Sequence, residues 1–227
     1  MAPSNPKTLQ PVTAISSTAA QISFWSSATF LLLLIVLHFI KPEFDQFWRF
    51  ISEYAIGDFG WLMVIAFLSL ALSYVALFIA IRPQVQTLGG RIGLVLLLIS
   101  ATGLFMAGIF TTDPITADKD SVTTSGMLHS LGGTLGIAMP FATIFISWTL
   151  YRNPNWVSMK RSVLGSAILV LVGFLVASIS LGVLLTQNNG VFGPEVPVGY
   201  PTRFEALTYC VWIMVVTRQA ISLKNKN

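Results

Sequence analysis

The first long apolar run in the chain is ISFWSSATFLLLLIVLHFI, residues 22–40. The hydrocarbon core of a membrane is about 30 Å thick, and a helix that rises about 1.5 Å per residue needs roughly 20 apolar residues to cross it. The run has that length and contains no lysine, arginine, aspartate or glutamate. Because backbone groups in lipid must be hydrogen bonded internally, we interpret the run as a membrane-spanning helix.

Five further runs have the same character, which predicts an all-α fold, a polytopic membrane bundle of six transmembrane helices. The predicted spans cover residues 22–40, 60–81, 92–110, 127–151, 162–185 and 204–223. Composition agrees, because only 10% of the 227 residues are charged, against about 25% in a soluble domain. We therefore expect one transmembrane domain over 22–223, a disordered cytoplasmic leader at 1–21 and a cytoplasmic tail at 224–227. The leader lacks a signal-peptide cleavage site, so the first helix should be retained.

The distribution of charge predicts the orientation in the membrane. With the N-terminus in the cytoplasm, the inner segments carry Lys7, Arg82, Arg91, Arg152, Lys160, Arg161, Arg218, Lys224 and Lys226. The outer segments carry only Lys41, Arg49, Lys119 and Arg203. Cytoplasmic loops are enriched in lysine and arginine, so we expect a multi-pass protein of the inner membrane with both termini in the cytoplasm. Every aspartate and glutamate then lies at the outer face.

The outer connections are longer than the inner ones. In the first, residues 41–59, apolar side chains recur at helical spacing: Phe44, Phe47, Trp48, Ile51 and Ala55. Pro42 and Glu43 suit a helix start and Gly57 suits its end, which predicts a short amphipathic helix in the outer interface. The third connection, residues 186–203, contains Asn188-Asn189-Gly190 and Gly193-Pro194 and is expected to form an irregular lid.

Small residues recur at helical spacing in three spans. The sets are Gly93, Ser100, Gly103 and Ala107; His129, Gly133, Gly136 and Pro140; and Ser166, Gly173, Ala177 and Ser180. Small residues let transmembrane helices approach closely, so we expect the three faces to meet and favour close packing over a ligand groove. Pro140 should kink the fourth span near its middle.

Six ionisable residues gather at the outer ends of the predicted helices and are the candidate site residues. They are His38, Glu53, Asp113, His129, Arg203 and Glu205. Glu53, Asp113 and His129 are the candidate catalytic acid, base or ligand groups, and the helix N-terminus at His129 favours a neutral imidazole. His38, Arg203 and Glu205 are ligand or ion-pair candidates. Arg203 can pair with a carboxylate of the set or grip a lipid phosphate.

Several other chemistries lack support in the sequence. The two histidines have no metal-binding spacing, so we predict no metal site. No phosphate-binding loop, nucleophile elbow or haem motif occurs, so we predict no cofactor. The cations are scattered singly rather than forming a basic stripe, which argues against nucleic acid as a partner despite a net charge of +4. Cys210 is the only cysteine.

Four elements in order resemble a known family. They are Ser52-Glu53-Tyr54-Ala55 with Gly57, Phe110-Thr111-Thr112-Asp113-Pro114, Gly126-Met127-Leu128-His129, and Arg203 before the last span. Together with six spans they resemble the bacterial and archaeal membrane family called domain of unknown function 998. Thr111 stands where family members often have proline, which affects loop shape and not the ionisable set. The resemblance implies the fold and the membrane location and implies no activity.

Three functions are compatible with these features. The favoured one is non-enzymatic: binding of a lipid or small solute, or a role in a protein complex or homo-oligomer, at the outer face. The alternative is a hydrolase or transferase that uses Glu53, Asp113 and His129. The third is a small-solute transporter, which is disfavoured because transporters place their sites near the midplane and few polar residues occur there.

Overall fold

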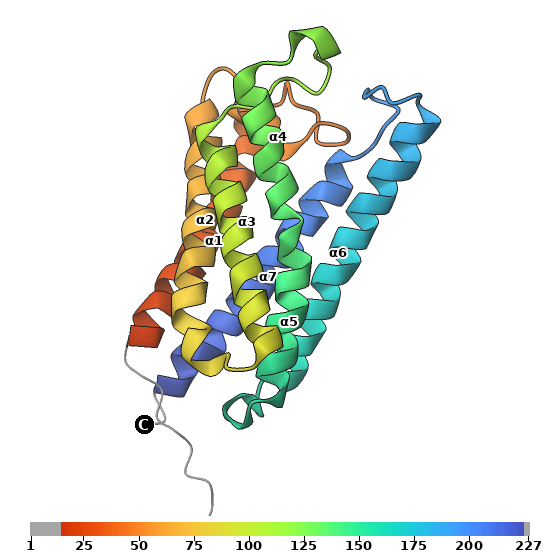
Figure 1. The fold of residues 1–227 in the computed structure, drawn as a ribbon. Coiled ribbons are helices and arrows are strands. Elements are labelled where there is room, and N and C mark those ends of the chain that lie inside the picture. The colour runs from red at the N-terminus through yellow and green to blue at the C-terminus, as the bar shows by residue number, and fades with distance from the viewer. Residues whose placement is uncertain (1–14, 225–227) are drawn as a thin grey trace, which may run out of the picture.

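The computed structural model describes residues 15–224 and is a bundle of helices whose long axes run roughly in one direction (Figure 1). Six helical segments are long and apolar enough to cross a membrane, which confirms the predicted polytopic all-α fold. The long helices are α1 (Ile15–Ile40), α2 (Gly60–Ile81), α3 (Leu88–Ile109), α4 (Thr124–Gly136), α5 (Ala138–Arg152), α6 (Lys160–Gln187) and α7 (Gly199–Lys224). Four short 3-10 helices lie in the connections: η1 (Ile51–Ala55), η2 (Arg82–Gln84), η3 (Lys119–Ser121) and η4 (Pro154–Trp156).

Neighbouring helices in the chain pack side by side around the bundle, with α4 and α5 together occupying one position between α3 and α6. The ring closes where α7 packs against α1. Three connections, residues 41–59, 110–123 and 188–198, lie at one end and contain every aspartate and glutamate except Glu205 in α7. We call this the acidic end. The opposite end, with connections 82–87 and 153–159, is the basic end.

The helix α1 begins at Ile15 rather than at the expected residue 22, so the predicted leader is wrong for residues 15–21. Ala19 and Ala20 are buried, and alanine has the highest helix propensity of all residues. An alanine-containing segment that packs against the bundle therefore extends the span. The rest of the predicted leader, residues 1–14, and most of the predicted tail lie outside the described residues.

The predicted kink at Pro140 is confirmed as a break between α4 and α5. The helix α4 ends at Gly136 and α5 begins at Ala138, with Ile137 between them. Proline has no backbone N–H and its ring crowds the carbonyl four residues earlier, which here belongs to Gly136. Both segments of the fourth span pack against α3, and α5 also packs against α6.

The third and fourth spans meet as expected, but through Gly132 and not through Gly133 and Gly136 of the predicted face. A Cβ atom on Gly103 of α3 would lie 2.4 Å from the Gly132 carbonyl oxygen, and one on Gly132 would lie 2.6 Å from that of Gly103. The prediction is wrong for the fifth span, because Gly173 of α6 packs instead against Thr208 of α7. A Cβ atom on Gly133 would have no neighbouring atom within 4 Å, so part of the fourth span's small face borders open space.

The first connection of the acidic end is helical over a shorter length than predicted. Only η1 is helical; turns occupy most of residues 41–50. Asp45 accepts a hydrogen bond from the Phe47 N–H at 2.8 Å, a local turn that competes with helix. Glu53 and Tyr54 of η1 are buried, so the helical segment faces the bundle.

Candidate functional site

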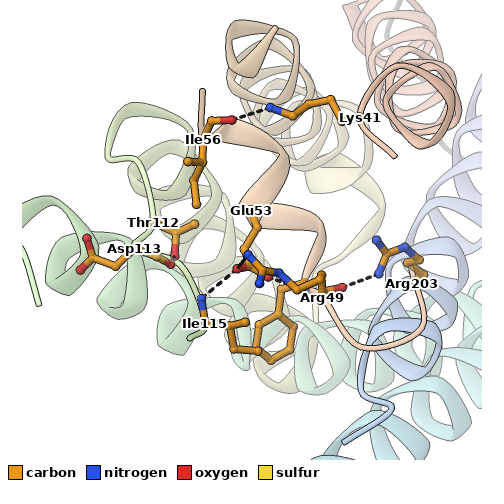
Figure 2. A network of polar contacts seen from close by, with 9 residues as sticks. Lys41, Arg49, Glu53, Ile56, Thr112, Asp113, Ile115 and Arg203 are labelled. Carbon is orange, nitrogen blue, oxygen red and sulfur yellow. Dashed lines mark hydrogen bonds and ion pairs between the residues drawn. The ribbon is translucent and has the colours of Figure 1, made fainter. Parts of the chain in front are cut away.

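Arg203, in the first turns of α7, joins three segments at the acidic end. Its guanidinium donates to the Arg49 carbonyl oxygen at 2.7 Å, to the Tyr54 hydroxyl at 3.1 Å and to the Gly199 carbonyl oxygen at 3.1 Å. Its Nε donates to His38 Nε2 at 2.9 Å. The residue thus binds four neutral acceptors rather than one of the carboxylates considered from the sequence. Figure 2 shows it reaching from α7 to the first connection.

The contact with Arg203 fixes the protonation of His38. Because Nε2 accepts a hydrogen bond from a guanidinium, the proton of the neutral ring must be on Nδ1. Nδ1 donates to the Leu34 carbonyl oxygen one turn earlier in α1. The Tyr54 ring lies 5.4 Å from the His38 ring, edge to face. His38 is therefore a positioning group between α1, η1 and α7.

Glu53 is 1% exposed and holds the first connection against the second. Its Oε1 accepts hydrogen bonds from the Ile115 N–H at 2.8 Å and from Arg49 at 2.7 Å, and its Oε2 accepts one from the Phe50 N–H at 3.1 Å. Burial raises the pKa of the Glu53 carboxyl, and the bonds from Ile115, Arg49 and Phe50 oppose that rise. Its carboxylate joins two connections that are far apart in sequence.

Lys41 is a buried cation that the sequence reasoning placed only in the charge count. Its ammonium group donates to the Ile56 carbonyl oxygen and, at 2.7 Å, to that of Asp58. It also lies 3.6 Å from a Glu43 carboxylate oxygen and 4.9 Å from the centre of the Phe44 ring. The sequence signal that could have indicated this buried role is the position of Lys41 directly after a long apolar helix. Lys41 therefore joins the start of the first connection to its end, at Ile56 and Asp58 (Figure 2).

Asp113 organises the second connection and the start of α4. Its two carboxylate oxygens accept hydrogen bonds, each at 2.8 Å, from the backbone N–H and the hydroxyl of Thr123. The Thr123 hydroxyl in turn accepts one from the Gly126 N–H at 3.0 Å, which caps α4. The Asp113 side chain points away from Glu53 (Figure 2). The contacts of Asp113 are therefore structural, and they hold the second connection against the start of α4.

His129 is buried in α4, and its Nδ1 lies 2.9 Å from the Phe110 carbonyl oxygen. A carbonyl can only accept, so Nδ1 carries a proton and Nε2 is the other, unbonded nitrogen among the described contacts. No described hydrogen bond joins two of Glu53, Asp113 and His129. The structure therefore gives the predicted catalytic residues three separate sets of partners.

A cavity of about 410 Å³ lies below η1 in the half of the bundle nearer the acidic end. Its walls come from α1, α2, α3, α4, α6 and α7, and most of the lining is apolar or glycine. The polar side chains of the lining are Ser52, Tyr74, Ser100, His129, Ser178, Thr202, Glu205 and Tyr209. Residues of both α4 and α6 line the cavity, and these two helices diverge toward the acidic end (Figure 1).

Buried contacts pack the half of the bundle nearer the basic end, on the side of the cavity that faces away from the acidic end. Ser23 and Ser73 donate to each other's carbonyl oxygens at 2.8 Å and join α1 to α2. Trp212 donates to the Ser147 hydroxyl at 2.8 Å and joins α7 to α5. A second hollow, of about 490 Å³, lies at the basic end and is lined only by α2, η2, α3 and the residues between them. It therefore lies beside one helix pair and not at the centre of the bundle.

Glu205 is the one carboxyl group that lines the central cavity in the described part of the chain. It lies in the second turn of α7, and its Oε1 accepts a hydrogen bond from the Tyr209 hydroxyl. Sequence reasoning named Glu205 but missed Tyr74 and Tyr209, since tyrosines in apolar spans are usually core residues. No group of three histidine, cysteine, aspartate or glutamate side chains in residues 15–224 is arranged to hold a metal.

Comparison with known proteins identifies the family. A family model with the description "Protein of unknown function (DUF998)" matches residues 25–219, which confirms the resemblance seen in the sequence. The match reaches into all six spans and includes every residue of the acidic-end contacts and the cavity. No curated protein and no solved structure matches the chain.

Proposed function

Since this chain belongs to the family described as protein of unknown function (DUF998), whose description states no activity, we propose a function from its own geometry. The protein binds an amphipathic molecule, a membrane lipid or a small lipid-like solute, in the cavity near its acidic end, and does not transform it. Membrane lipids are thus its proposed partners.

The cavity is the observation that carries this proposal. Its volume of about 410 Å³ lies within the range of about 300–1,000 Å³ typical of small-molecule sites, which are mostly apolar with a few polar groups. Gly133 and Gly136 of α4 line it, and a Cβ atom on either would have no atom within 4 Å. Glycine at these positions keeps open a space that any larger residue would occupy.

Binding without catalysis fits the contacts of the acid–base candidates. Glu53 and Asp113 are occupied by backbone N–H groups and by Arg49 or Thr123, which are the partners of structural carboxylates. A general acid or base must reach the proton that it transfers, directly or through one water. Of the three residues, only His129 lines the cavity. A hydrolase that uses all three stays a prediction.

We also propose that the acidic end faces the outside of the inner membrane and that both termini are cytoplasmic. The support is the concentration of lysine and arginine at the basic end, where Arg82, Arg91, Arg152, Lys160 and Arg161 lie in the connections or in the helix ends next to them. A ligand would then reach the cavity from the outer leaflet, between α4 and α6.

The test is to fill the cavity and measure what the protein retains. We expect the wild type, purified in a mild maltoside detergent, to carry a bound amphiphile in native mass spectrometry. The variant Gly136→Leu should lose it. Gly165→Leu is the matched control, because a Cβ atom on Gly165 of α6 would also have no atom within 4 Å, but Gly165 does not line the cavity. Equal retention by Gly136→Leu, or no bound molecule in the wild type, would overturn the proposal.

A further inference from the structure

The cavity has one carboxyl group in its described lining, that of Glu205, and we propose that this group receives the protonated amine of the bound amphiphile. The inference rests on the proposed function and specifies its ligand: one apolar chain that ends in an ammonium group. The chain would lie along the apolar wall and the ammonium group would contact the Glu205 carboxylate.

No lysine or arginine side chain that the structure describes lines the cavity. A carboxylate in an apolar, low-dielectric site is costly unless a cation or several hydrogen-bond donors accompany it. Glu205 has one described donor, the Tyr209 hydroxyl, whereas the buried Glu53 has Arg49 and two backbone N–H groups. The protein thus supplies a complete set of partners to one carboxylate and leaves the other short of them.

Arg203 does not neutralise Glu205 although it is only two positions away. Residues i and i+2 lie about 200° apart around a helix of 3.6 residues per turn, so their side chains leave opposite sides of α7. The guanidinium of Arg203 is directed to His38, Tyr54 and the Arg49 carbonyl oxygen, which all belong to other segments.

The surroundings of Glu205 suit an ammonium group. Oε1 is bound to Tyr209, and Oε2 accepts none of the described hydrogen bonds, so one oxygen is available to a ligand. The rings of Tyr74, Tyr209 and Phe174 line the same cavity, and aromatic faces attract cations. A charge-assisted hydrogen bond to a carboxylate is about twice as strong as a neutral one.

The experiment compares two probes that differ only in the head group, dodecylammonium and dodecanol. Binding to the full-length protein in maltoside micelles is measured by native mass spectrometry and by competition with a fluorescent amphiphile. We expect dodecylammonium to bind about tenfold more tightly than dodecanol, the effect of one charge-assisted contact. The variant Glu205→Gln should bind both probes with equal affinity.

A second variant covers the case in which Glu205→Gln does not fold. Tyr209→Phe removes the hydroxyl and keeps the carboxylate, so it should preserve or increase the preference for the amine. Equal binding of the two probes to the wild type, or an unchanged preference in Glu205→Gln, would overturn this inference and leave the proposed function standing. Failure of both probes to bind would overturn the proposed function itself.

Two natural sources can provide the amine, and a lipid arm distinguishes them. Lysophosphatidylethanolamine and lysophosphatidylglycerol of equal chain length replace the dodecyl probes. A preference for the ethanolamine lipid that is lost in Glu205→Gln assigns the amine to a lipid head group. Equal binding of the two lipids, together with a preference for dodecylammonium, assigns it to a soluble amphiphilic amine.

Discussion

Arg203 donates hydrogen bonds to four acceptors that lie in different directions, and this requires the several N–H groups of a planar guanidinium. Lysine in its place keeps the charge but offers one compact ammonium group. We expect Arg203→Lys to lower the free energy of unfolding by about 1–3 kcal/mol, because the contacts to His38, Tyr54 and the Arg49 carbonyl are not all replaced. Thermal unfolding in detergent measures the effect. Arg218→Lys is the control, since Arg218 is exposed on the same helix; equal melting temperatures of the two variants would contradict the prediction.

Glu53 makes stability depend on pH. Its pKa in the folded protein is raised above the ordinary value of 4.5, chiefly by burial, so the folded state holds its proton to higher pH than the unfolded state does. Its contribution to stability is then largest below that value and declines as the pH rises through the raised pKa. We expect the melting temperature of the wild type to fall over this window and that of Glu53→Gln to lack this decline. Parallel pH profiles would count against the prediction.

At the residue scale, sequence reasoning could find ionisable residues but not their partners. Glu53 and Arg49 are separated by four positions, so their pairing could be anticipated from a helical pattern. The four acceptors of Arg203 come from α1, the first connection, η1 and α7, and only the fold brings these together. For the same reason Glu205 could be named but not assigned to a cavity.

Two adjacent glycines of α4 have opposite surroundings, which gives a prediction at the scale of the helix pair. Gly132→Ala places a Cβ atom 2.6 Å from the Gly103 carbonyl oxygen, so α3 and α4 must separate. We expect a loss of about 1–3 kcal/mol, the usual cost of overpacking. Gly133→Ala enters open space and should be neutral or stabilise α4 by up to about 1 kcal/mol, because alanine is the better helix former.

Melting temperatures of the two variants in the same detergent test this contrast. A similar destabilisation by both would show that Gly133 is packed as tightly as Gly132, and would remove an argument for the cavity. The wild type and Gly103→Ala complete the series. Gly103→Ala should behave like Gly132→Ala, because each glycine faces the other's carbonyl oxygen.

At the scale of elements, local rules worked where a single residue dominates. Pro140 dictated the break between α4 and α5 by crowding Gly136, as expected from proline chemistry alone. The end of α6 is set by a Schellman motif, in which Asn189 has a positive φ of 56° and the Gly190 N–H donates to the Leu185 carbonyl at 2.8 Å. The first connection was harder to predict, because Asp45 and Lys41 form local contacts that compete with a longer helix.

At the scale of the whole molecule, the centre of the bundle is packed in one half and open in the other. Contacts such as Ser23 with Ser73 and Trp212 with Ser147 hold the basic-end half together. The acidic-end half is held instead by its connections, through Arg203 and Glu53, around a cavity that the helices leave between them. The hydropathy pattern predicts the six spans, but it cannot distinguish a glycine that packs from one that leaves space.

Orientation is the property of the whole molecule that decides from which side a ligand enters, and the single native cysteine makes it measurable. Cys210 is buried in α7 and should stay unlabelled by a membrane-impermeant maleimide. Thr116→Cys places an exposed thiol in a connection of the acidic end, and Gln86→Cys places one at the basic end. In intact cells we expect labelling of Thr116→Cys alone, with Gln86→Cys labelled only after the membrane is permeabilised. The reverse pattern would turn the acidic end toward the cytoplasm, and the cavity would then be supplied from the inner leaflet.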